Sequence, residues 1–305
     1  MPLTTRVASL VWATLGLATA ALAQPLATPQ DTRTATAAST ISQRPDERRG
    51  DAALTYSVLG QPVSLGISWE MAQERRLNVD LDAARQRGRD VTDHEVKLDA
   101  RWRPAANLTA FVQAVALAER RREMRDGSVR KRHSTERGQT WLLFEQLGGT
   151  AASLQLGRIA LIDRRAWWWD DDLDAIRLTL PMAQGRIETG VARELLKVAS
   201  VDNGIAPELR GLNRWFGHAT RAWGEGQQVE AFWLFQHDGS GAPAPGALFD
   251  DGRQDPSDAS LRWLGLRATG EKRWASGHRA LYRIDGAMLR GRETLTRFDE
   301  LKSGQ

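Results

Sequence analysis

The chain has 305 residues, no cysteine, and 42 Lys and Arg against 38 Asp and Glu, which gives a formal net charge of +4. Without cysteine, the sequence excludes disulfide-stapled extracellular scaffolds, thiolate metal sites and cysteine nucleophiles. All but five of the cations are Arg. That residue suits bidentate contact with carboxylates and phosphates, so the skew points to ion-paired surfaces or an anionic polymer; the codon bias of a GC-rich genome explains it equally well.

The first 23 residues have the pattern of a secretory signal. Arg6 precedes an apolar run rich in Ala and Leu, which ends at the small-x-small site Ala21-Leu22-Ala23. No stretch reaches the roughly 18 consecutive apolar residues that a helical membrane span requires. We therefore expect export, cleavage near Ala23, and then a flexible segment, 24–50, rich in Thr, Ala, Pro and charge.

From residue 51 to residue 293 the dominant period is two, which is typical of strands with two differently solvated faces. Around Lys97 the alternation is complete, because one face is ionic and the other apolar. A helical interpretation fails, since apolar positions recur at i, i+2 and i+4 and β-branched residues are frequent. Eleven strands are expected, at 62–81, 92–103, 107–121, 138–147, 150–159, 173–180, 185–197, 213–223, 227–237, 260–270 and 278–292.

The connections between these strands alternate in length. Short turns at 104–106, 148–149, 181–184 and 224–226 alternate with long loops at 82–91, 122–137, 160–172, 198–212 and 238–259. Sorting by length predicts an antiparallel transmembrane β-barrel with tight periplasmic turns and long extracellular loops, followed by an irregular tail, 294–305. A soluble β-sandwich or solenoid also alternates, but it has no reason to sort its loops by end.

The segment 157–178, GRIALIDRRAWWWDDDLDAIRL, resembles the signature of the bacterial alginate export porins. The matching positions are Gly157, Arg158, Arg165, Trp167, Asp170, Leu173, Asp174, Ala175 and Arg177. Further matches at 100–104, 263–270 and 282–293 extend the resemblance from about residue 55 to residue 293. The resemblance implies an outer-membrane barrel whose lumen, lined with Arg and Lys, passes a polyuronate to the exterior.

The chain departs from that family in two ways. Ile159 stands where the family usually has Gln. The family's barrels have eighteen strands, whereas about eleven are expected here, and the C-terminal stretch 298–305 lacks a terminal strand ending in an aromatic residue. We therefore expect a C-terminally truncated or frameshifted member.

Strand parity selects the charged side chains that face the lumen. The expected substrate-binding cations are Lys97, Arg101, Arg177, Arg267 and Arg283, and the expected counter-charges are Glu70, Glu95, Asp99 and Asp285. Arg158 is added from the resemblance, although it has the apolar parity of Leu156, so that either a bulge re-aims it or it lies at the outer rim. For any single Arg, pairing with a carboxylate of a neighbouring strand is an equally good interpretation.

The expected loop of the family motif carries Arg165, Trp167, Asp170 and Asp174. Clustered carboxylates from 170 to 174 suit Ca²⁺, but no glycine-punctuated ligand loop surrounds them, which favours a solvated acidic loop without metal or cofactor. The tryptophans 167–169 either wedge this loop against the wall or stack on sugar rings.

No catalytic signature appears. The five His are scattered without metal-ligand spacing, and no nucleophile elbow or P-loop occurs. The Arg-rich stretch 120–137 is interpreted as a solvated loop or a lipopolysaccharide contact, because export argues against nucleic acid. The expected function is therefore passive export of an anionic, alginate-like polysaccharide, with outer-membrane lipid, lipopolysaccharide and periplasmic export machinery as partners. The alternatives are a porin for other substrates and an exported glycan-binding β-sheet protein that does not transport.

Overall fold

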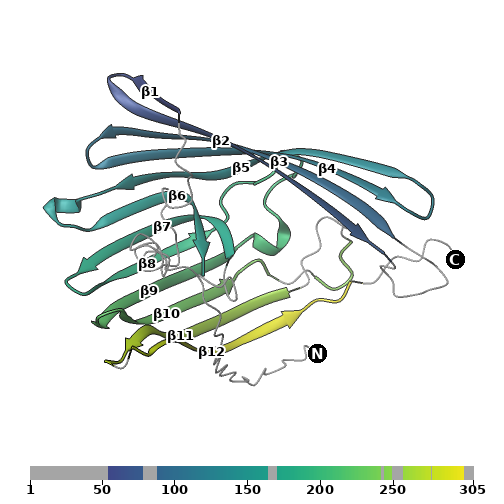
Figure 1. Cartoon of the computed structure of the whole chain (residues 1–305). Helices are drawn as coiled ribbons and strands as arrows, with labels where there is room; N and C mark the ends of the chain where they lie inside the picture. Colours follow the sequence, from purple (N-terminus) through teal and green to yellow (C-terminus); the bar gives the residue numbers. More distant parts are fainter. Residues whose placement is uncertain are drawn as a thin grey trace.

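The computed structural model describes residues 54–77, 88–163, 170–241, 244–248, 257–275 and 277–298. These residues form one antiparallel sheet of twelve strands in chain order (Figure 1). The strands are β1 (Leu54–Val58), β2 (Gln61–Arg76), β3 (Arg89–Ala105), β4 (Leu108–Glu123), β5 (Val129–Phe144), β6 (Ser153–Ile162), β7 (Asp170–Met182), β8 (Gly185–Arg193), β9 (Leu212–Gly224), β10 (Gln227–Asp238), β11 (Ser257–Arg273) and β12 (Arg279–Leu295).

The expected all-β antiparallel fold is confirmed. The only helices among the described residues are two short 3-10 turns, η2 (Leu147–Gly149) and η3 (Pro207–Leu209). No helix in this part of the chain is long and apolar enough to cross a membrane. β1 and β12 form the two edges of the sheet.

Three sequence expectations about the strands were wrong. β1 was missed, because its five residues are too few for a periodic pattern to stand out. The expected loop 122–137 is instead mostly strand, since β4 and β5 stay paired as far as Arg122 and Val129 and leave only a tight turn. The expected loop 160–172 is also shorter, because β6 and β7 remain paired as far as Ile162 and Asp170. In β4, β5 and β7 the backbone ladder continues through charged side chains that hide the period, and in β6 it continues through the unbroken apolar run Ala160-Leu161-Ile162.

The two faces of the sheet differ in chemistry. Aliphatic and aromatic side chains cover one face and remain exposed, Ile67 at 72% and Leu266 at 62%. They lie opposite one another from strand to strand, as Ile67 does with Leu98 and Ile176 with Val191. The other face carries the ionic side chains and, in the second half of the sheet, is buried. We call these the outer face and the inner face.

The β6–β7 hairpin leaves the wall of the sheet and crosses the inner face (Figure 1). β5 and β6 are paired only from Thr140 opposite Arg158 to the short-turn end. Beyond that point, residues 158–161 of β6 are buried on both sides. At the tip of the hairpin, Asp163 Oδ1 lies 3.0 Å from a guanidinium nitrogen of Arg267 on β11, five strands away in the sheet. Only a path across the inner face brings these two residues together.

Gly157 marks the point where the hairpin bends away. Its φ is +125°, a region that residues with a Cβ rarely adopt. A Cβ here would lie 2.2 Å from the carbonyl oxygen of Thr140. The neighbouring strand is irregular at the same level, because the β4–β5 register shifts between Val112 and Ala114. The divergence of β5 and β6 therefore rests on a glycine in one strand and an irregularity in the other.

The connection from β8 to β9 takes the place that β6 leaves. The amide of Arg137 donates to the carbonyl of Val198 (3.0 Å), and the amide of Ser200 donates to the carbonyl of Thr135 (2.7 Å). An antiparallel bridge between Glu136 and Ala199 completes the contact. Backbone groups of β5 that β6 leaves unpaired are thus satisfied by a segment, 198–200, that follows β8.

A hydrophobic cluster holds the hairpin on the inner face. Ile159, Leu161 and Leu173 of the hairpin are at most 1% exposed. They pack with inner-face residues of six other strands, namely Phe111, Trp141, Ala192, Phe216, Leu234 and Trp263. The rings of Phe111 and Trp141 stack with centroids 5.1 Å apart. Burying one such side chain stabilises by about 1.5–3 kcal/mol, which is why a charged sheet face tolerates an apolar hairpin over it.

Candidate functional site

The described residues hold two buried ionic clusters, and the first, on the inner face, is centred on Arg267. Its Nε donates to Asp285 (2.5 Å), and its two terminal nitrogens lie 3.2 Å from Glu230 and 3.0 Å from Asp163. His218, fully buried, has its Nε2 2.9 Å from the same Glu230 oxygen. Register explains the assembly, because Glu230, Arg267 and Asp285 lie opposite one another on three neighbouring strands. One guanidinium here contacts carboxylates from both the wall and the hairpin.

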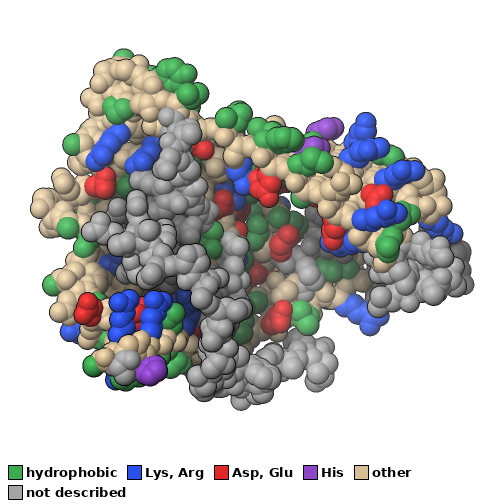
Figure 2. All heavy atoms as spheres, in the orientation of Figure 1, with side chains coloured by type: hydrophobic (Ala, Val, Ile, Leu, Met, Phe, Trp, Pro, Cys, Tyr) green, Lys and Arg blue, Asp and Glu red, His purple; other side chains and the backbone are tan. Residues whose placement is uncertain are grey.

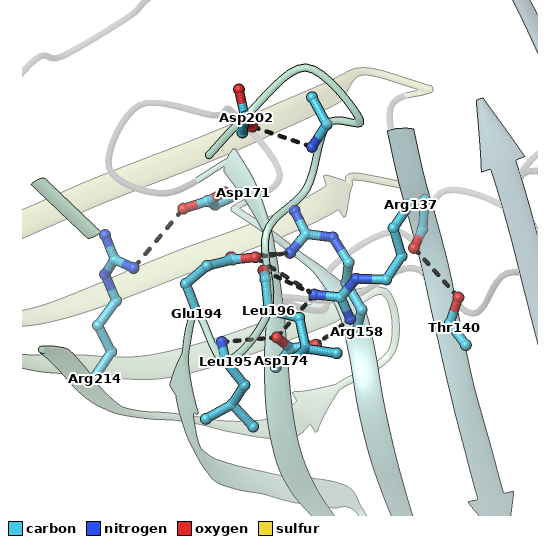
Figure 3. Close-up of polar contacts among 12 residues, drawn as sticks. Arg137, Thr140, Arg158, Asp171, Asp174, Glu194, Leu195, Leu196, Asp202 and Arg214 are labelled. Carbon is cyan, nitrogen blue, oxygen red and sulfur yellow. Dashed lines mark hydrogen bonds and ion pairs between the residues drawn. The ribbon is translucent and has the colours of Figure 1, made fainter. Parts of the chain in front are cut away.

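The second cluster ties the hairpin to the segment after β8 (Figure 3). Arg137 of β5 donates twice to Asp174 of β7, at 2.6 and 2.9 Å, and Arg158 of β6 donates to both oxygens of Glu194, at 2.7 and 2.9 Å. The amide of Leu195 donates to Asp174 at 2.9 Å. Burial raises the pKa of Glu194, against the lowering effect of its hydrogen bonds from Arg158. The Arg137–Asp174 pair is bidentate, with two nitrogens on two oxygens, whereas a single nitrogen of Arg158 contacts both oxygens of Glu194. We call this second cluster the clamp.

Arg158, Arg177 and Arg267 are therefore buried rather than in open solvent. Each is at most 8% exposed. The guanidinium of Arg177 donates to the side chain of Gln155 on the neighbouring strand. Arg158 follows the bend at Gly157 and is buried against Glu194 of the segment after β8. Asp285 is buried with Arg267.

All but one of the remaining predicted residues line the uncovered part of the inner face, on β2 and β3. Lys97 is half-exposed and pairs with Glu95 of its own strand. Asp99 and Arg101 follow it at the same parity, and Glu70 lies directly opposite Glu95. Arg283, on β12, is exposed. The structure thus brings Lys97, Arg101 and their counter-charges together and separates them from the buried arginines.

An acidic hollow adjoins Lys97 on this uncovered surface. Its volume is about 380 Å³, and its charged lining comprises Glu70, Asp93, Glu95, Glu119, Glu136 and Arg132. Carboxylates outnumber cations here, so the uncovered inner surface is mixed in charge and locally acidic. Among the described residues, no group of three or more His, Asp or Glu is placed to hold a metal ion.

The residues of the family motif fall in three places. Arg165 and Trp167 lie outside the described residues, as does the side chain of Asp170. Asp174 belongs to the buried clamp, while Asp171 lies 3.8 Å from Arg214 of β9. Because 171 and 174 have opposite parities in β7, their carboxylates face different partners. At these two positions, strand residues paired with arginines replace the expected solvated acidic loop.

Sequence reasoning missed several members of both clusters. Glu230 and His218 could have been found, because they have the inward parity of strands that were correctly located. Asp163 follows the apolar run of β6, but its partner 104 residues away gives no local signal. Arg137 and Glu194 depend on the contact between the segment after β8 and β5, which no periodicity encodes.

No family model and no curated protein sequence matches this chain. Among the described residues, the charged groups of the two buried clusters are held by one another. The inner face therefore has two parts. One is filled by the β6–β7 hairpin, and the other, on β2 and β3, is charged and accessible to water. Such a surface can attract, repel and guide an ionic solute.

Proposed function

We propose that this chain builds a pore wall in the outer membrane of a Gram-negative cell, after removal of the signal near Ala23, and that an anionic polysaccharide passes along its uncovered inner surface. The outer face is the observation that carries the proposal. Large apolar side chains such as Ile67, Trp69 and Leu98 remain more than half exposed. In water such a face would be exposed at a free-energy penalty, whereas the hydrocarbon core of a membrane imposes none.

The length of the apolar band supports this location. On β2 the outer residues from Val63 to Met71 are all apolar, and on β4 the same holds from Ala110 to Ala118. Eight residue steps at 3.3 Å span about 26 Å along the strand. The apolar band of outer-membrane barrels is about 25 Å tall.

Closure of the sheet is part of the proposal. The outward edges of β1 and β12 carry backbone groups that need partners within hydrocarbon. The resemblance to alginate export porins implies that further strands, to a total of eighteen, supply them. In that barrel the β6–β7 hairpin would narrow the lumen, and the polymer would pass on the side of β2 and β3.

We propose that Lys97 and Arg101 attract the carboxylates of the polymer. The neighbouring carboxylates of Glu95 and Asp99 weaken that attraction, so that the polymer can dissociate and move on. The acidic hollow beside Lys97 favours a second candidate, a porin of broad or cation-tolerant selectivity. A polysaccharide exporter would receive its polymer from periplasmic export machinery, whereas a porin for small solutes needs no such partner. The two candidates also differ in whether a polyuronate should block the channel.

Conductance of the refolded protein in planar bilayers tests the pore itself. We expect discrete channels and heat-modifiable gel mobility. A water-soluble product with unchanged mobility on heating and no conductance would contradict the pore and leave the exported glycan-binding β-sheet protein as the better description.

Block by polyuronate oligomers tests the substrate. We expect block in the wild type, weakened about tenfold by Lys97→Glu because a charge that attracts carboxylates is reversed inside a narrow aqueous path. Arg221→Glu is the matched control, since it makes the same change on the outer face near a short turn. Equal block in all three proteins would favour the porin of broad selectivity.

A further inference from the structure

The outer face changes character towards the long-loop end of β2 to β5. On β4, Val112, Ala114, Ala116 and Ala118 are followed at the same parity by Arg120 and Arg122. On β2, Trp69 and Met71 are followed by Gln73 and Arg75. The rings of Trp69 and His94 stack at this boundary, with centroids 6.1 Å apart. Towards the long-loop end of these strands, the outer face therefore changes from apolar residues to aromatic rings and then to cations.

Arg120 and Lys131 are directly opposite each other on β4 and β5. Like charges in that position destabilise a ladder unless an anion lies between them. On its other side Arg120 faces Thr92, so the nearest cross-strand neighbours include no carboxylate. One level higher, Asp90 faces Arg122 and also lies 3.5 Å from Arg75. The described part of the outer face thus leaves the Arg120–Lys131 pair without an acidic partner of its own.

A hollow of about 370 Å³ lies directly below this pair. Its outer-face lining includes His94, Val96, Ala116, Ala118, His133 and Thr135. Ala118 precedes Arg120 by two residues, so the floor lies about 7 Å from the cations along the strand. Blue Lys and Arg side chains gather at this end of the strands in Figure 2, next to purple His and green hydrophobic groups.

We infer that this surface binds a phosphorylated glycolipid of the outer leaflet, with phosphate on Arg120 and Lys131 and an acyl chain in the hollow below. The inference rests on the proposed membrane location. Arg can donate two parallel hydrogen bonds to a phosphate, and the apolar floor suits an acyl chain, which a soluble polyuronate does not have. The opposed cations and the hollow lie on the outer face, away from the path proposed for the polymer.

The test refolds the protein into phosphatidylcholine vesicles that contain lipid A, with vesicles without lipid A as the blank. The protein is then purified, and the amount of lipid A that remains bound to it is measured. We expect R120Q/K131Q to weaken binding about tenfold, because two charge-assisted contacts to phosphate are lost. R125Q/R130Q removes the same charge from the same hairpin but leaves the Arg120–Lys131 pair intact, and it should change binding less than about threefold. Lipid A without phosphates should bind the wild type as weakly as phosphorylated lipid A binds R120Q/K131Q.

Several outcomes would overturn the inference. Equal lipid A binding by wild type and R120Q/K131Q, in proteins that both insert into the vesicles with heat-modifiable mobility, refutes the site and leaves the pore proposal standing. If polyuronate oligomers carrying the same total negative charge as the lipid A displace it, the surface binds the polymer instead. A chain that fails to partition into vesicles refutes the membrane location and this site together.

Discussion

Lys97 and Arg177 occupy equivalent positions in their strands, yet the protein uses them differently. Each lies between two apolar residues and points to the inner face. Lys97 on β3 has a side chain 39% exposed, whereas Arg177 on β7 is 8% exposed and bound to Gln155. Arg177 belongs to the β6–β7 hairpin, which crosses the inner face, whereas Lys97 lies on the part of that face that the hairpin leaves open. Burial of an inward charge therefore depends on what folds over the sheet, and alternation within the strand does not decide it.

The largest expected effect concerns the covered region. Arg267→Met leaves the carboxylates of Asp163, Glu230 and Asp285 buried without their cation. Removing one partner of a buried ion pair costs about 3–5 kcal/mol. Urea titration of the protein in vesicles should show this loss, and a change of less than 1 kcal/mol would contradict the cluster.

Leu161→Ala tests whether the hairpin is packed against the inner face. The side chain is fully buried among apolar partners, so truncation should cost about 2–5 kcal/mol. Leu65→Ala is the matched control on the exposed outer face of the open region, and we expect a clearly smaller loss in the same titration. Equal losses for the two variants would mean that the hairpin does not pack as described.

Gly157→Ala probes the bend at the boundary between the two regions. A side chain at φ +125° is strained and approaches the carbonyl of Thr140, which together should cost about 1–3 kcal/mol. Because the hairpin would be pushed out of place, limited proteolysis should cut near its tip faster than in the wild type. The same change at Gly286, where a Cβ meets nothing within 4 Å, is the control.

The smallest effect on stability is expected in the open region. Lys97→Met removes a half-exposed ion pair with Glu95, and such pairs contribute at most about 1 kcal/mol. The unfolding midpoint should hardly move. A loss comparable with that of Arg267→Met would show that the β2–β3 surface is as tightly held as the covered one.

Alternation predicted most of the strands and the side on which Lys97, Arg101, Arg177 and Arg267 lie, because a period of two is a local property of the chain. It could not predict the division between covered and open regions, since Asp163 and Arg267 are 104 residues apart. Arg158 illustrates the limit. Its parity places it with the apolar residues, and only the bend at Gly157 and the segment after β8 bury it against Glu194. The family signature includes Gly157, but the pattern alone does not show that the chain bends there.

The bridge between Glu136 and Ala199 has a consequence for assembly. The segment 198–200 occupies the place beside β5 that the hairpin left, so it shuts the opening through which the hairpin turned inward. β5, the hairpin and β8 must all be in position before that segment can pair. A chain in which β6 stayed paired with β5 as far as Glu136 would have no place for 198–200, so the bridge depends on the departure of the hairpin from the wall.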